Sequence, residues 1–187
     1  INYSATFAIS FLMSIYLQSV LGLSSREAGL VMLIQPIVMA MLSPTAGKLS
    51  DRHSPTRIAT VGMAITALGI LGLVAVVHLE SLWLVVPVVV IIGIGFALFA
   101  APNNNAIMGA VPKRYYSLAT SMIGTVRLVG QVISVAIVTM VLSLDWNWLP
   151  QLEGLVRNIE ISFIVFTLLC LIGILPSVAR RARGTER

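Results

Sequence analysis

The sequence predicts an all-α protein that crosses a lipid bilayer six times. Its 187 residues are 58% hydrophobic and only 10% charged, whereas a soluble domain carries about 25% charged residues. Its apolar runs also match the ~20 residues that a helix needs to cross a hydrocarbon core. The runs lack the alternation of polar and apolar residues typical of a barrel strand. Helices are therefore the expected spanning structure, because each helix satisfies its own backbone hydrogen bonds in lipid.

Six apolar segments are predicted to be the spanning helices. At a rise of about 1.5 Å per residue, each is long enough to cross a core of about 30 Å. The first has no basic region before it and no cleavage site after it, so it is not a signal peptide. We expect Ile1 to be an internal position of a longer protein. The segments are Tyr3–Leu21, Ala28–Ala46, Ile58–Val77, Leu82–Ala101, Ser117–Ser143 and Ile159–Val178.

Basic residues are concentrated in alternate connections. Nine of the twelve Lys and Arg residues lie in Gly47–Arg57, in Pro102–Tyr116 and in the tail at 179–187, and two lie in the other connections. Because cytoplasmic loops carry the Lys and Arg excess, we expect this set, and both ends of the chain, to face the cytoplasm. The formal charge of +5 is then explained by membrane topology, and no nucleic-acid partner is expected.

Enzyme and metal signatures are missing. His53 and His78 are assigned to opposite sides of the membrane, so they cannot share a metal ion. No glycine-rich phosphate loop and no nucleophile elbow occurs. The single cysteine, Cys170, lies inside an apolar run and has no intrachain partner. We expect no catalysis, no metal and no cofactor.

The connection between the second and third segments carries a resemblance to a known family. It reads Gly47-Lys48-Leu49-Ser50-Asp51-Arg52-His53-Ser54-Pro55-Thr56-Arg57. This resembles the signature loop of the major facilitator superfamily, in which Asp-Arg follows a glycine at the fourth position. Downstream, Pro102-Asn103, Val111-Pro112 and Arg127…Gly130 look like the second half of multidrug:proton antiporters in that superfamily. One departure is Ser54, where the family has glycine.

The resemblance implies that this connection is a conformational latch made of Gly47, Asp51, Arg52 and Arg57. Asp51 can accept hydrogen bonds from a helix N-terminus or an arginine, and Gly47 allows another helix to approach closely. Such a cluster can form in one conformation and break in the other. A solvated loop that only sets topology is the alternative.

Arg127 is the main candidate for a substrate-site residue. Counting from Ser117, it lies about 15 Å deep, near the bilayer midplane. Intramembrane charges usually mark functional sites. We expect Arg127 to face a central cavity and to pair with a carboxylate of the other half, an anionic substrate group or helix carbonyls; a structural pair between helices is the alternative. No midplane carboxylate occurs in the chain, so a proton-coupling group is expected in an absent N-terminal half.

Other polar residues and two prolines complete the candidate set. Gln18, Gln35, Asn103 and Asn105 are candidate cavity-wall residues, although buried amides more often bond neighbouring helices. Pro36 and Pro102 are expected to bend their helices, because proline frees a backbone carbonyl.

The predicted architecture is the C-terminal six-helix half of a major facilitator fold, residues 1–187, with inverted repeats at 3–77 and 82–178. The family likeness implies a multi-pass protein of a bacterial or archaeal plasma membrane that works with a missing N-terminal half. It is expected to export amphipathic, often cationic compounds by alternating access, driven by a proton gradient. A sugar or amino-acid exporter and a non-transporting, self-associating membrane scaffold are the alternatives.

Overall fold

The computed structural model describes residues 2–146 and 149–184, except for the side chains of Asn2 and of residues 176–184. The described residues form six long helices and no strand. Each helix, counted with the short turn next to it, is long and apolar enough to cross a membrane, which confirms the predicted fold class. The helices are α1 (Asn2–Ile15), α2 (Ser25–Arg52), α3 (Pro55–Leu79), α4 (Leu82–Gly109), α5 (Tyr116–Leu142) and α6 (Gln151–Gly184).

Two short turns extend the spans. A π-helical turn (Tyr16–Val20) continues α1, and a 3-10 turn (Lys113–Tyr115) leads into α5. The chain then reverses at Gly22, whose φ of 66° lies in the left-handed region that glycine adopts without strain. Ser24 and Glu27 close a reciprocal capping box that starts α2.

The helices extend further than the apolar runs predict. The expected connection Gly47–Arg57 is almost entirely helical, because α2 continues to Arg52 and α3 begins at Pro55. Only His53 and Ser54 form the turn, and neither has a positive φ. Ser54 therefore replaces the family's glycine without strain, since Pro55 at the first helical position directs the chain into α3.

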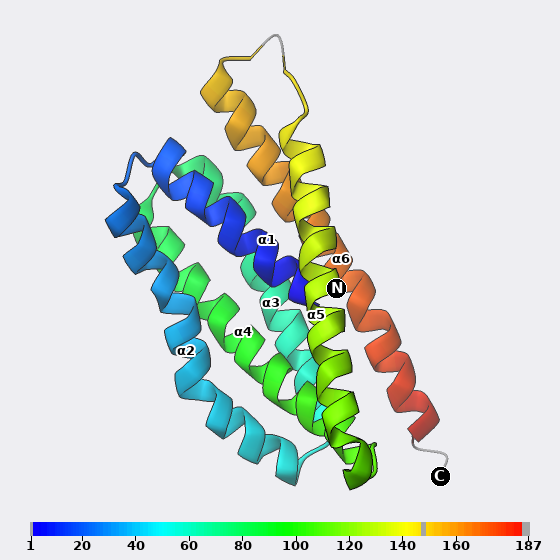
Figure 1. Ribbon diagram of the computed structural model, residues 1–187. Coiled ribbons are helices and arrows are strands. Elements are labelled where there is room, and N and C mark those ends of the chain that lie inside the picture. The colour runs from blue at the N-terminus through cyan, green and yellow to red at the C-terminus, as the bar shows by residue number, and fades with distance from the viewer. Residues whose placement is uncertain (1, 147–148, 185–187) are drawn as a thin grey trace.

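Most contacts between helices join the first three helices of the chain to the last three. α4 packs against α3 and α2, while α1 packs against α5 and α6, and α3 also packs against α6 (Figure 1). In the most apolar stretches of α3 and α4, 50% of the residues are buried, against 6% in α2 and 17% in α5. α2 and α5 are thus peripheral helices with exposed apolar faces, and α3 and α4 form much of the core.

α3 and α4 cross in backbone contact. A Cβ atom at Gly62 would lie 2.6 Å from the Gly95 carbonyl oxygen, and one at Gly95 would lie 2.6 Å from the Thr66 backbone nitrogen. Glycine is required at both positions because no side chain fits between the two backbones. Gly93 and Gly130 also pack against neighbouring helices, α2 and α1, but a Cβ there would come no closer than 3.0 and 3.2 Å.

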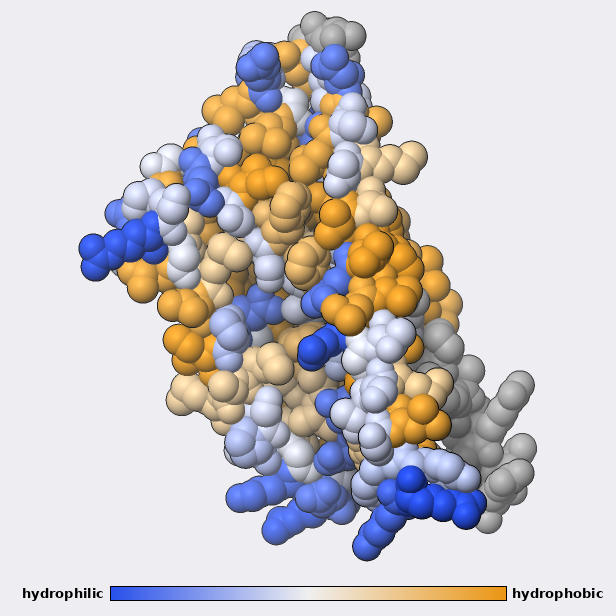
Figure 2. All heavy atoms as spheres, in the orientation of Figure 1, coloured by the Kyte–Doolittle hydropathy of each residue, from blue (hydrophilic) through white to orange (hydrophobic). Residues whose placement is uncertain are grey.

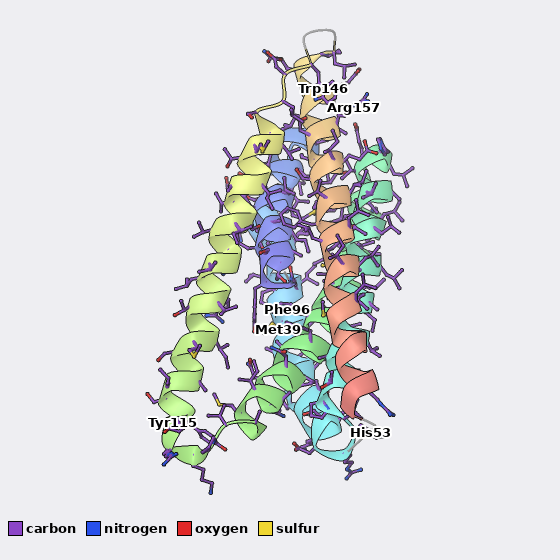
Figure 3. The ribbon with its side chains drawn as sticks, turned by 90° about the vertical axis from the view of Figure 1, so that its right-hand side faces the viewer. Met39, His53, Phe96, Tyr115, Trp146 and Arg157 are labelled. Atoms are coloured by element: carbon purple, nitrogen blue, oxygen red, sulfur yellow. The ribbon has the colours of Figure 1, made fainter. Side chains whose placement is uncertain are left out.

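The basic connections gather at one end of the bundle. The α2–α3 turn, the end of α4 and the C-terminal end of α6 lie together at the bottom of Figure 1. His53 and Tyr115 mark this end in Figure 3, and Trp146 and Arg157 mark the opposite end. His78 contacts Glu160 at that opposite end, so the two histidines are well separated. The tail at 179–187 falls outside the described side chains, and which end faces the cytoplasm stays a prediction.

Candidate functional site

A polar pocket of about 280 Å³ lies between α1, α2, α4 and α5. Met39 and Phe96, which line it, sit near mid-height of the bundle (Figure 3). Figure 2 shows hydrophilic side chains at mid-height, surrounded by apolar ones, on the face turned to the viewer. The ten lining residues are Tyr3, Thr6, Phe7, Ser10, Met39, Phe96, Ala100, Asn104, Arg127 and Gln131.

Helical spacing brings these residues together. Phe96, Ala100 and Asn104 recur every fourth residue on α4, so they share one face. Arg127 and Gln131 are one turn apart on α5 for the same reason. Each helix therefore presents one stripe to the pocket, and its polar members lie in an otherwise apolar span.

A buried hydrogen bond holds α5 against α1 beside the pocket. The Ser4 hydroxyl donates to the Gly130 carbonyl oxygen at 2.6 Å. A Cβ at Gly130 would come within 3.2 Å of that hydroxyl oxygen, so glycine permits this approach. Because Gly130 lies between Arg127 and Gln131 in the sequence, the contact sets the position of both side chains relative to Tyr3.

Three aromatic rings form the apolar wall. The Tyr3 ring meets the Phe96 and Phe99 rings edge to face, with centroid distances of 5.8 and 5.9 Å. Edge-to-face pairs are favourable because the positive ring edge meets the negative ring face. The cluster connects α1 to α4 and fixes the orientation of the two rings, Tyr3 and Phe96, that line the pocket.

Arg127, Gln131 and Asn104 form no side-chain hydrogen bond with one another, whereas the Ser10 hydroxyl donates to the Thr6 carbonyl oxygen at 3.2 Å. No described Asp or Glu forms a salt bridge with Arg127, and none lines the pocket. The side-chain oxygen of Asn104 is buried and has no hydrogen-bond partner. Buried polar groups are nearly always satisfied, so this oxygen is an exception, and Arg127 and Gln131 on α5 are the side-chain donors that line the pocket beside it.

The other predicted cavity residues do not line the polar pocket. Gln35 lines a separate hollow of about 20 Å³ between α1, α2 and α4, which shares Ser10 with the polar pocket. Gln18 donates to Ser14 and accepts from Ser25, so it joins α1 to the start of α2. Asn103 does not line the polar pocket. The sequence signal for the missed residue Gln131 is its spacing of one helical turn from Arg127.

Asn105 forms a bond between helices instead of lining the polar pocket. Its amide donates to the Ser50 hydroxyl at 2.7 Å, and Ser50 donates to the Gly47 carbonyl at 2.7 Å. This chain of bonds joins the ends of α2 and α4 at the basic end of the bundle. Asn105 therefore has the more common role of an amide in a spanning helix, a bond to a neighbouring helix.

Asn105→Ala is expected to lower the thermal stability of the full-length protein without altering its substrate profile. The lost hydrogen bond is worth about 1 kcal/mol, and the position is outside the polar pocket. Thermal unfolding in detergent measures the first effect and dye transport the second. Asn103→Ala, which removes no such bond to Ser50, is the matched control. A changed substrate profile for Asn105→Ala alone would contradict this assignment.

The candidate latch residues are exposed at the basic end. Asp51, Arg52 and Arg57 are all exposed, and none forms a salt bridge with a described residue. A Cβ at Gly47 would meet no atom of the described residues within 4 Å, so the expected close approach of another helix at Gly47 is not seen in the described part of the chain. The charged groups are free to meet a partner outside it.

Both predicted bend prolines lie inside continuous helices. Pro36 is in α2 with Pro44, and Pro102 is in α4 with Pro87. α2 is visibly curved in Figure 1. Since proline removes one backbone donor, each leaves a carbonyl of the preceding turn without its helical partner.

A second cavity, of about 340 Å³, lies at the end opposite the basic connections. It is lined by residues from the end of α3 and the start of α6, where His78 Nε2 lies 3.1 Å from a carboxylate oxygen of Glu160. Glu160 is thereby placed at the end of the bundle and not at mid-height. Among the described residues, no three His, Cys, Asp or Glu side chains group as a metal site.

Comparison with known families decides the classification of this arrangement. The family model described as Major Facilitator Superfamily matches residues 1–187. The chain belongs to the major facilitator superfamily. This superfamily comprises transporters, which agrees with the expectation that the chain is not an enzyme. No solved structure matches the chain.

Several relatives within the superfamily are named for what they carry or resist. A riboflavin transporter of Clostridioides difficile is 33% identical over 67% of this chain. A methyl viologen resistance protein of Salmonella typhimurium is 31% identical over 73% of the chain, and a lincomycin resistance protein of Listeria monocytogenes is 25% identical over 95%. The matched stretches cover 27%, 28% and 40% of those proteins.

Proposed function

We propose that this chain is part of a secondary transporter that exports small amphipathic aromatic compounds by alternating access, with a proton gradient as the energy source. The observation that carries the proposal is the polar pocket at mid-height with Arg127, Gln131 and Asn104 in its wall. Transport sites of superfamily members lie near the midplane, at the interface of their two halves. The names of the lincomycin and methyl viologen resistance relatives support export.

The proposal assigns the remaining parts of the site to protein outside this chain. The exposed apolar faces of α2 and α5 would pack against an N-terminal half, and that half would supply the group that carries protons, because no carboxylate lines the pocket. Asp51, Arg52 and Arg57 would form the latch with it. The second helix of each three-helix unit packs against the first helix of the other unit, α2 against α4 and α5 against α1. This equivalence of contacts supports the inverted repeats 3–77 and 82–178. The bacterial relatives support a bacterial plasma membrane, and the excess of Lys and Arg in alternate connections favours both ends of the chain in the cytoplasm.

A metabolite exporter is the second candidate function, because one relative is named a riboflavin transporter. A self-associating scaffold would need free faces of small residues on its helices, whereas Gly93 packs on α2 and Gly130 packs on α1 within the chain, which favours a transporter over the scaffold.

Dye uptake by energised inverted vesicles that contain the full-length protein tests the proposal. Fluorescein and rhodamine 6G, two aromatic dyes of opposite charge, are offered separately. We expect uptake of at least one dye, because export from the cell is transport into an inverted vesicle. This uptake should stop when a protonophore collapses the gradient. Vesicles without the protein are the control. Uptake of neither dye by folded protein, or uptake that survives collapse of the gradient, would contradict proton-coupled export.

A further inference from the structure

The polar pocket is positively charged. Arg127 carries a permanent charge and five N–H donors, and Gln131, one turn away, adds an amide. The lining contains no Asp, Glu or other negatively charged group. A cation that enters the pocket from this side would meet a like charge with no compensating carboxylate, whereas an anion would gain charge-assisted hydrogen bonds.

The α4 wall of the pocket carries one unsatisfied polar atom. Asn104 reaches the pocket from α4, and its side-chain oxygen is buried without a hydrogen-bond partner. This oxygen is enclosed in the present conformation, so the guanidinium of Arg127 and the amide of Gln131 are the donors on α5 that the pocket offers to a ligand.

The aromatic wall defines the body of that ligand. Tyr3, Phe7 and Phe96 line the pocket, and the Tyr3 and Phe96 rings are held edge to face at 5.8 Å. Rings fixed in this way offer flat apolar surface to a planar aromatic ligand. Met39 adds a polarisable side chain that adapts to ligands of different outline.

We infer that the substrates of this pocket are aromatic organic anions, whose negative group binds Arg127 and Gln131 and whose ring lies against Tyr3 and Phe96. This inference rests on the proposed function, because it treats the polar pocket as the transport site. It differs from the preference for cations that the family resemblance implies, because the part of the pocket supplied by this chain holds Arg127 and no carboxylate.

Fluorescence anisotropy of the two dyes on purified full-length protein tests the inference. Fluorescein and rhodamine 6G share a xanthene ring system, but fluorescein has a free carboxylate and rhodamine 6G is a cation. Fluorescein is expected to bind wild-type protein at least tenfold more tightly, after subtraction of binding to empty micelles. Tighter binding of rhodamine 6G would overturn the inference, and this comparison needs no variant.

Three substitutions assign the effect to the pocket. Arg127→Gln is expected to weaken fluorescein binding at least tenfold, Arg127→Lys to weaken it less, and Arg127→Glu to reverse the preference in favour of rhodamine 6G. Arg114→Gln, which removes an exposed arginine outside the pocket, is the matched control and should change neither dye. Fluorescein affinity that is unchanged in a monodisperse Arg127→Gln protein would overturn the inference.

Comparison with the vesicle assay separates the two proposals. If fluorescein binds through Arg127 but neither dye is pumped, the substrate class stands and the export proposal fails. If rhodamine 6G is pumped in response to the gradient while fluorescein is neither bound nor pumped, export stands and the anion preference is overturned.

Discussion

Gly95→Leu is expected to prevent folding of the six-helix unit. A Cβ at this position would lie 2.6 Å from both the backbone nitrogen and the hydroxyl oxygen of Thr66, so the backbones of α3 and α4 would have to separate. Even Gly95→Ala should cost about 3 kcal/mol, at the upper end of the range for overpacked sites. Expression of the full-length protein, its elution profile in detergent and its thermal unfolding midpoint measure the effect.

Gly29→Ala is the matched control for this prediction. Gly29 is also a helical glycine within a span, but a Cβ there would meet nothing within 4 Å. Alanine is a better helix former than glycine by about 1 kcal/mol, so the variant should be as stable as the wild type or more stable. A Gly95→Ala protein that unfolds at the same temperature as Gly29→Ala would show that α3 and α4 do not touch at Gly95.

Arg127→Leu is expected to reduce transport by about tenfold to a hundredfold without loss of stability. A hydrogen bond to a charged group is worth about 1.5–3 kcal/mol, and about 1.4 kcal/mol corresponds to a factor of ten in affinity. No described residue forms a salt bridge with Arg127, so its removal breaks no such contact in this chain. Dye flux and the thermal unfolding midpoint of the full-length protein are the two measurements.

The stability measurement distinguishes a substrate-site arginine from a structural one. If Arg127 formed a buried pair with a carboxylate of another part of the protein, its loss would leave that charge uncompensated and cost about 3–5 kcal/mol. A large fall in the unfolding midpoint would therefore favour the structural pair. Arg114→Leu, outside the pocket, controls for the removal of a positive charge.

Much of the fold follows from local properties of the chain. Length and hydropathy predict each span. The helices α2 and α3 begin three residues before the predicted Ala28 and Ile58, at the local signals of a capping box (Ser24 and Glu27) and a proline (Pro55). These signals act over a few residues, which is why they are readable without a structure. The boundaries of α2 and α6 differ from the prediction because a helix can continue past its apolar run, from the membrane into the polar region, without a change of conformation.

The candidate site is harder to predict from the sequence than the fold. Arg127 is identified by the cost of a charge in lipid, and it lines the pocket as expected. Asn103, Asn104 and Asn105 are consecutive and chemically identical, yet only Asn104 lines the pocket, while Asn105 bonds Ser50. Successive residues on a helix point in directions about 100° apart, so only the packing of α4 against its neighbours selects one of the three.

The sequence by itself determined that this chain spans a membrane as helices, that its basic connections alternate, and that it resembles the major facilitator superfamily. Hydropathy, charge and a short motif are local, and they hold whatever the helices touch. Tertiary structure alone decided that α3 and α4 meet at Gly62 and Gly95, that Ser4 holds α5 at Gly130, and that Tyr3, Asn104 and Arg127 share one pocket. These contacts join residues far apart in the chain, and their geometry depends on helix crossings that no local pattern encodes.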